Sequence, residues 1–108
     1  MADAPNKIEF YKSGLRKYAH QDFASARDDF IAALELDANF GDVHHSLAHA
    51  YEKLAEYDLA LASALRAVES APEDPLTHTT LSVMYQRKGM IPEAEAEMAR
   101  ANELSVKA

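Results

Sequence analysis

Residues 41–74 read GDVHHSLAHAYEKLAEYDLALASALRAVESAPED, a pattern that predicts two helices joined by a short turn. The first half repeats apolar or aromatic residues at steps of three and four, at His44, Leu47, Ala48 and Tyr51. Such steps are typical of a helix with one buried stripe. In the second half, Ala60 and Ala67 lie about two helical turns apart and therefore share one helical face.

The same pattern occurs three times along the chain. Shifting the sequence by 34 residues aligns segments 7–40, 41–74 and 75–108. The strongest columns are alanine, at Ala26, Ala60 and Ala94 and at Ala33, Ala67 and Ala101. Side chains this small allow a neighbouring helix to approach closely. We therefore expect a single domain over 7–108 and a flexible N-terminal segment over 1–6.

Turn residues divide each repeat into two helices. Gln21-Asp22, Ala55-Glu56 and Lys88-Gly89 interrupt the pattern within the repeats, and Pro92 suits a first helical turn. The predicted helices are 7–20, 23–36, 41–54, 57–70, 75–88 and 92–105. The expected fold class is all-α.

These columns resemble the tetratricopeptide repeat, a helix pair with a period of 34 residues. The second repeat matches it best, at Leu47, Ala48, Tyr51, Tyr57, Ala60, Ala67 and Pro72. The resemblance implies a right-handed α-solenoid of three helix pairs. It also implies a protein-protein interaction scaffold that holds a peptide or protein segment in its concave groove.

The chain departs from the family pattern in two places. Ser13 and Lys17 stand where an apolar residue and a tyrosine are usual, and Gly14, Leu15 and Tyr18 are expected to fill that gap. The aromatic at the head of the repeat is kept as Phe10 but replaced by His44 and His78. We expect both histidines to pack in the core.

The last helix of the repeat array is more polar than its counterparts. Glu95, Ala99 and Asn102 replace apolar residues of the earlier repeats, so no fourth repeat is expected. Apolar residues remain at Met90, Ile91, Met98 and Leu104. An exposed strip of this kind favours self-association, so a homo-oligomeric assembly unit, such as a homodimer, is the alternative function.

Composition narrows the classes of partner. The chain carries 18 acidic and 11 basic residues, a net charge of −7, which disfavours nucleic acid and anionic membrane as partners. It has no cysteine, so thiol chemistry and disulfides are excluded. The N-terminus shows no secretory signal or membrane span, so a cytoplasmic location is expected. No phosphate-binding loop, nucleophile motif or cofactor motif is present, and neither an enzyme nor a cofactor is expected.

The family resemblance implies that the first helix of each pair lines the groove. The partner-binding residues it indicates are Tyr11, Lys12, Leu15, Tyr18, His45, His49, Glu52, Thr80, Val83 and Arg87. First helices carry a net positive charge and second helices a net negative one, which predicts a mildly basic groove. Family members that clamp the C-terminal carboxylate of chaperones use lysine, asparagine and arginine at positions that here read Tyr11, Leu15, Ser46, Leu76 and Thr80. That clamp is not expected.

His45 and His49 also raise two minor hypotheses. They lie four residues apart, with Glu52 one turn further, so two imidazoles and a carboxylate are candidate metal ligands. The alternative is that they are ordinary surface residues, because no glutamate stands between them as in a metalloprotease helix. Histidines in the groove also predict that binding changes as pH crosses about 6.5.

Overall fold

The computed structural model describes residues 4–107, which form six α-helices and no strand. The helices are α1 (Lys7–Ala19), α2 (Phe23–Leu36), α3 (Gly41–Lys53), α4 (Tyr57–Ser70), α5 (Pro75–Arg87) and α6 (Ile91–Lys107). All six predicted helices are confirmed, and each predicted end lies within two residues of the observed one.

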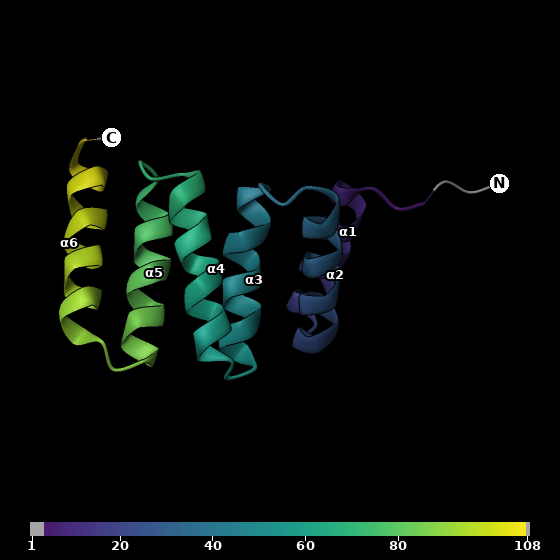
Figure 1. Cartoon of the computed structure of the whole chain (residues 1–108), viewed down its shortest axis with the longest axis horizontal. Helices are drawn as coiled ribbons and strands as arrows, with labels where there is room; N and C mark the ends of the chain where they lie inside the picture. Colours follow the sequence, from purple (N-terminus) through teal and green to yellow (C-terminus); the bar gives the residue numbers. More distant parts are fainter. Residues whose placement is uncertain (1–3, 108) are drawn as a thin grey trace.

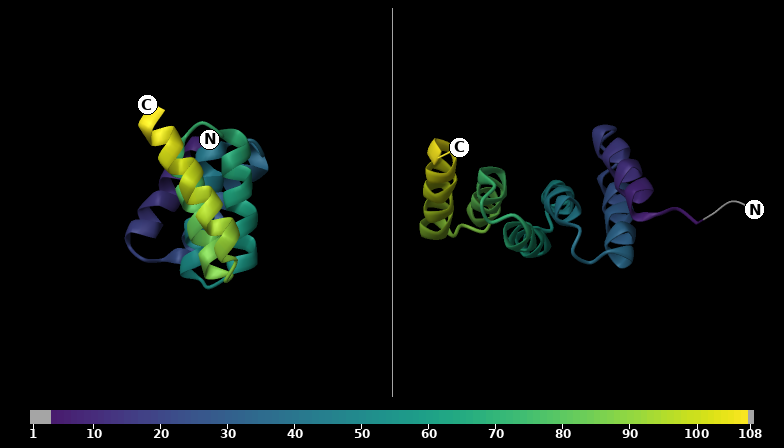
Figure 2. Two further views of the ribbon diagram at one scale, coloured as in Figure 1. Left: turned by 90° about the vertical axis from the view of Figure 1, so that its left-hand side faces the viewer. Right: turned by 90° about the horizontal axis from the view of Figure 1, so that it is seen from above.

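The helices stand side by side in chain order, from the N-terminal pair at the right of Figure 1 to α6 at the left. The resulting stack measures 52 × 29 × 21 Å, and Figure 2 shows it from one end and from above. Each helix packs against the next in sequence, and α3 also contacts α1 and α5. Over residues 4–107 no second helix of a pair contacts another second helix, so α1, α3 and α5 form the inner layer of the solenoid.

Side chains and turns fix the helix boundaries. Asn6 and Glu9 form a reciprocal capping box at the start of α1, and Asp74 accepts from Leu76 N, 3.0 Å away, where α5 begins at Pro75. Residues 1–3 of the segment expected to be flexible lie outside the described residues. Asn6, its last residue, is the cap of α1.

The turn inside each pair repeats one backbone conformation. Gln21, Ala55 and Gly89 have φ values of 65°, 59° and 73°, and they occupy equivalent positions in the three repeats. This left-handed conformation is favourable for glycine and costs other residues about 1–2 kcal/mol. Only the third repeat has glycine there, so the other two turns are held by the packing of their helices.

The alanine columns lie in the core, as predicted. Ala26, Ala33, Ala60, Ala67, Ala94 and Ala101 are all buried. A second column of small residues, Gly14, Ala48 and Ser82, is buried beside them. A Cβ on Gly14 would lie 2.5 Å from Phe30 Cε1, so the ring of Phe30 occupies the space that a side chain on α1 would need.

The gap left by Ser13 and Lys17 is filled only in part. Tyr18 packs against the core and against Phe23, with ring centroids 5.1 Å apart. Leu15 was expected to help, but 41% of it is exposed at the surface. The prediction was wrong for Leu15 because the ring of Phe30, on α2, already occupies the space beneath α1.

His44 and His78 are buried, which confirms their place in the core. Each ring donates from Nε2 to a carbonyl six residues earlier, Ala38 O at 2.8 Å and Pro72 O at 2.7 Å. A phenylalanine in this column fills the same space without this bond. The histidines therefore tie the start of α3 and α5 to the turn that precedes each helix.

The C-terminal repeat follows its predicted polarity. Glu95, Ala99 and Asn102 are exposed on α6. The expected apolar strip is smaller than predicted, because Leu104 is buried while Ile91 is about half exposed. Among residues 4–107, no helix is both long enough and apolar enough to cross a bilayer.

Candidate functional site

The predicted groove residues all lie on the inner layer, on α1, α3 and α5. They meet along two contacts between helices. We call the α1–α3 contact the first seam; its residues are Leu15, Tyr18, Ser46 and the near sides of His45 and His49. We call the α3–α5 contact the second seam; its residues are His45, His49, Glu52, Thr80 and Arg87.

Polar bonds close the second seam. Thr80 Oγ1 lies 2.8 Å from His45 Nε2 and 3.4 Å from His49 Nε2, and Thr80 is 2% exposed. A hydroxyl can both donate and accept, so one side chain of α5 bridges the two imidazoles of α3. One turn further, Arg87 Nε donates to Glu52 Oε2 over 2.9 Å. These bonds hold α3 and α5 in a fixed register.

The electrostatic surroundings keep His45 neutral. Burial and the neighbouring His49 lower the pKa of His45, and the carboxylates of Asp74 and Asp42 offset part of this effect. Burial, with Glu52 as a smaller cause, raises the pKa of the Tyr18 hydroxyl. At neutral pH the groove therefore presents a neutral imidazole and a protonated phenol as hydrogen-bonding groups.

The metal hypothesis finds no support in this geometry. His45 Nε2 is engaged by Thr80, and His49 Nδ1 lies 3.7 Å from Glu52 Oε1. Across residues 4–107, no three histidines, cysteines or acidic residues are grouped so that they could hold a metal ion. His45, His49 and Glu52 share a helical face, as predicted, but the structure uses them to join α3 to α5.

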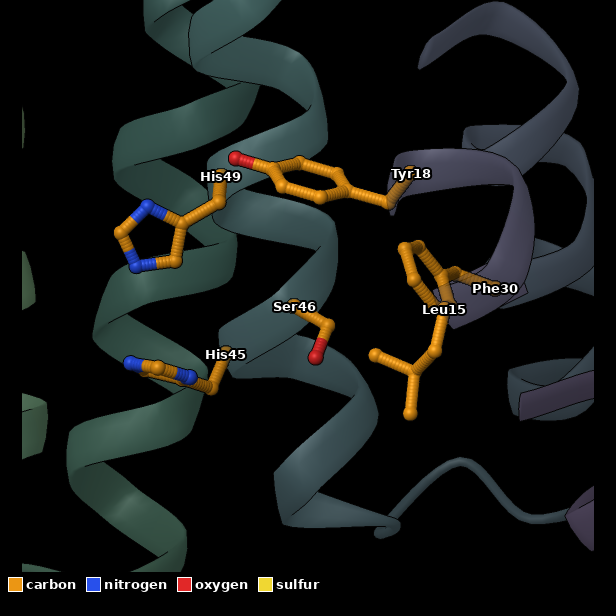
Figure 3. A pocket seen from close by; sticks show the side chains of 6 residues that line it. All are labelled: Leu15, Tyr18, Phe30, His45, Ser46 and His49. Carbon is orange, nitrogen blue, oxygen red and sulfur yellow. The ribbon is translucent and has the colours of Figure 1, made fainter. Parts of the chain in front are cut away.

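Within residues 4–107, the first seam lacks the side-chain bonds that join the second. A hollow of about 280 Å³ lies there, lined by Leu15, Tyr18, Phe30, His45, Ser46 and His49. In Figure 3, Leu15 and Ser46 point toward one another across it, and Tyr18 extends from α1 toward α3. Over the described part of the chain, no side-chain hydrogen bond or ion pair joins α1 to α3. A separate hollow of about 290 Å³ borders His45, Leu76 and Thr77, where α3 and α5 begin.

The predicted site residues therefore divide into groups with different roles. Leu15, Tyr18, His45 and His49 line the hollow, and Glu52, Thr80 and Arg87 close the second seam. Tyr11 packs between the rings of Phe30 and Phe40, and Val83 packs against the second core cluster, so both contribute to folding. Lys12 is exposed.

Phe30 was missed as a lining residue of the hollow. It belongs to the second helix of its pair, whereas the family resemblance indicated groove residues only on first helices. Gly14 was the signal that could have found it. A missing side chain on α1 allows a ring from α2 to reach through to the inner layer.

The predicted basic charge of the groove is largely neutralised. Lys7 Nζ lies 2.6 Å from Asp37 Oδ2 and Lys17 Nζ lies 3.0 Å from Asp29 Oδ2, while Lys88 pairs with Asp58 and Arg87 with Glu52. Among the described residues of the first helices, the cations without such a partner are Lys12, Arg16 and Lys53. These three cations lie on α1 and α3.

Comparison with known proteins agrees with this architecture. The family model of the tetratricopeptide repeat matches residues 41–74. The photosystem I assembly protein Ycf3 of Synechococcus sp. (strain WH7803) is 26% identical over 97 residues, which cover 87% of this chain and 56% of that protein. The chain thus spans about half the length of this curated relative.

Solved structures extend the agreement to the whole fold. MamA superposes with a TM-score of 0.91 at 21% identity, covering 97% of this chain and 61% of MamA. The first tetratricopeptide domain of Spaghetti (RPAP3), bound to the HSP90 peptide SRMEEVD, superposes with a TM-score of 0.89 at 16% identity, covering 99% of this chain and 85% of that one. The central repeat therefore matches the tetratricopeptide repeat family, and the described chain has the fold of these solved structures along its length.

Proposed function

We propose that this chain is a protein-interaction module that binds an extended segment of a partner protein across α1, α3 and α5. The observation that carries the proposal is the hollow at the first seam, where Leu15 lies opposite Ser46 and Tyr18 extends toward α3 beside His49. A concave, mostly apolar recess with a few polar groups is the usual form of a binding site. The Spaghetti domain, which superposes over nearly the whole chain, holds a peptide and supports this proposal.

The second seam contributes to this function as a preorganised part of the groove. His45, His49 and Thr80 are already bonded to one another, so binding does not have to order them. A site that is organised in advance loses less conformational entropy when a ligand binds. The groove is therefore built from one fixed seam beside one open seam.

The partner is not a chaperone tail held by a carboxylate clamp. The clamp positions carry Tyr11, Leu15, Ser46, Leu76 and Thr80, none of which has a cationic side chain. A terminal carboxylate is bound most strongly by charge-assisted hydrogen bonds, and these residues supply none. We propose no enzymatic activity.

The test is to select binders from a displayed library of random dodecapeptides and to map them on the isotope-labelled chain by NMR. Backbone amide shifts should concentrate on α1, α3 and α5. Shifts confined to α2, α4 and α6 would place the binding surface on the convex side and contradict groove binding. Failure to enrich any peptide would contradict peptide binding altogether.

Self-association is the second candidate function. Apolar side chains are exposed at both ends of the stack, Ile8 on α1 and Ile91 on α6. The net charge of −7 opposes the approach of two copies. Light scattering after size exclusion at two concentrations distinguishes the two candidate functions. A stable dimer would support self-assembly, whereas a monomer would leave the groove available to a partner.

A further inference from the structure

The first seam has a chemical character that narrows the kind of partner. Leu15, Tyr18 and Phe30 supply apolar surface on one side of the hollow, and Ser46 and the two imidazoles supply the other. Leu15 is 41% exposed although it stands beside this recess. Covering a half-exposed leucine removes apolar surface from water, so an apolar side chain is the favoured occupant.

The size of the hollow suits one side chain. Its volume is about 280 Å³. A cavity of about 150 Å³ holds a benzene ring, whereas pockets for drug-sized ligands begin at about 300 Å³. The hollow is therefore large enough for a leucine or phenylalanine side chain.

Three cations lie close to the lining residues of the hollow along α1 and α3. Lys12 lies one turn before Leu15 on α1, Arg16 is the next residue after it, and Lys53 lies one turn after His49 on α3. No ion pair engages these three cations within residues 4–107. Of the nearby acids, Glu52 is already paired with Arg87. The carboxylates of Asp74 and Asp42 act on His45 at the other end of the groove.

We propose that the groove recognises a partner segment in which one leucine- or phenylalanine-sized side chain enters the first seam and acidic residues on either side of it contact Lys12, Arg16 and Lys53. This inference rests on the proposed function and specifies the chemistry of the partner. The net charge of −7 makes a second copy of this chain a poorer occupant than an acidic segment directed to these cations.

The enriched dodecapeptides test the inference by their composition. One large apolar residue with aspartate or glutamate within three positions on each side should be enriched. Enrichment of lysine or arginine around the apolar residue would overturn the charge complementarity. Replacing the apolar residue of a selected peptide with alanine should weaken its dissociation constant about tenfold or more, as expected for a central anchor.

Two leucines provide a matched pair of protein variants. Leu15 on α1 and Leu65 on α4 are 41% and 40% exposed, but only Leu15 lines the hollow. Leu15→Ala should weaken binding of the same peptide about tenfold, while Leu65→Ala should change it less than twofold. Equal effects of the two variants would overturn the anchor site.

A charge pair completes the test. Lys12→Glu should weaken binding several-fold, and this loss should shrink as salt is raised, because exposed charges are screened. Lys107→Glu, an exposed lysine at the far end of α6, is the control for net charge. If peptides shift the NMR signals of α1, α3 and α5 but Leu15→Ala and Lys12→Glu leave their dissociation constants unchanged, the anchor inference fails while groove binding stands. If no peptide is enriched, both fail.

Discussion

The two seams occupy equivalent positions in the repeat but are closed by different side chains. Moving back 34 residues converts the His45–Thr80 pair of the second seam into Tyr11 and Ser46, and the His49–Thr80 pair into Leu15 and Ser46. The second seam has bonds of 2.8 and 3.4 Å to Thr80, and the first has the hollow. A leucine cannot bond to a hydroxyl.

This difference shows where specificity arises in a repeat protein. The backbone period places the same positions face to face at each seam, so the geometry is shared. Individual side chains then decide whether a seam is bonded or left open. The four predictions below alter one seam at a time, beginning with the largest expected effect.

Removing the Phe30 ring, which lines the hollow, should cause the largest loss of stability. Phe30 is fully buried, and Phe30→Ala should lower the free energy of unfolding by about 3–5 kcal/mol in urea denaturation. Hydrogen exchange should show α1 and α2 opening before α5 and α6. Leu65→Ala, at an exposed position, should cost less than about 1 kcal/mol. A loss in Phe30→Ala no larger than in this control would show that the ring does not support the first seam.

Adding a side chain beside Phe30 should also destabilise the packing of α1 against α2. Gly14→Ala places a Cβ 2.5 Å from the Phe30 ring and should cost about 1–3 kcal/mol, even though alanine favours helix. A double-mutant cycle separates crowding from propensity. In the Phe30→Ala background the same change should be neutral or stabilising, and an unchanged cost there would exclude a clash with the ring.

Breaking the second seam should have a moderate effect. Thr80→Val keeps the shape but removes the hydroxyl between the imidazoles, at a cost of about 1–2 kcal/mol to the free energy of unfolding. Thr79→Val is the control, because the Thr79 hydroxyl bonds only to Pro75 O of its own helix. Equal stability of the two variants in urea denaturation would mean that the bonds to Thr80 contribute nothing.

Acidification should weaken the second seam selectively, with the smallest change of the four. The pKa of His45 is lowered from 6.5 in the folded chain, so the unfolded chain binds this proton more tightly. Stability from this group is therefore fully present above pH 6.5 and is lost as pH falls toward the folded pKa. Urea denaturation between pH 5 and 8 measures the slope, and His45→Gln should reduce it. An unchanged slope in His45→Gln would assign the pH dependence to other groups.

Sequence reasoning located the helices because it depended on local and periodic signals. Alanine columns, turn residues and the period of 34 are visible in one dimension, and each predicted boundary lies close to the observed one. The buried positions of His44 and His78 also followed from their column. Their bonds to Ala38 O and Pro72 O did not follow, because a residue pattern does not show where a loop carbonyl points.

Sequence reasoning located the groove residues less well. It assigned the groove to α1, α3 and α5 and treated Tyr11, Leu15 and Thr80 as equivalent, whereas Tyr11 packs in the core, Leu15 borders a hollow and Thr80 joins two helices. It also counted charges without their partners. Lys7 is paired with an acid of the α2–α3 turn, and Lys17 with an acid of α2. Charges summed separately for first and second helices do not show such pairs.

The sequence alone determined the number of helices and their limits, because a repeat period and helical spacing are properties of the chain itself. The inner layer was expected only from the family resemblance. Only the tertiary structure decided which seam is open. That outcome depends on a missing side chain at Gly14, a ring from α2 and a leucine opposite a serine, and these residues meet only when the helices pack. Whether side chains fill or leave a space depends on distances across helices, which residue spacing along the chain does not contain.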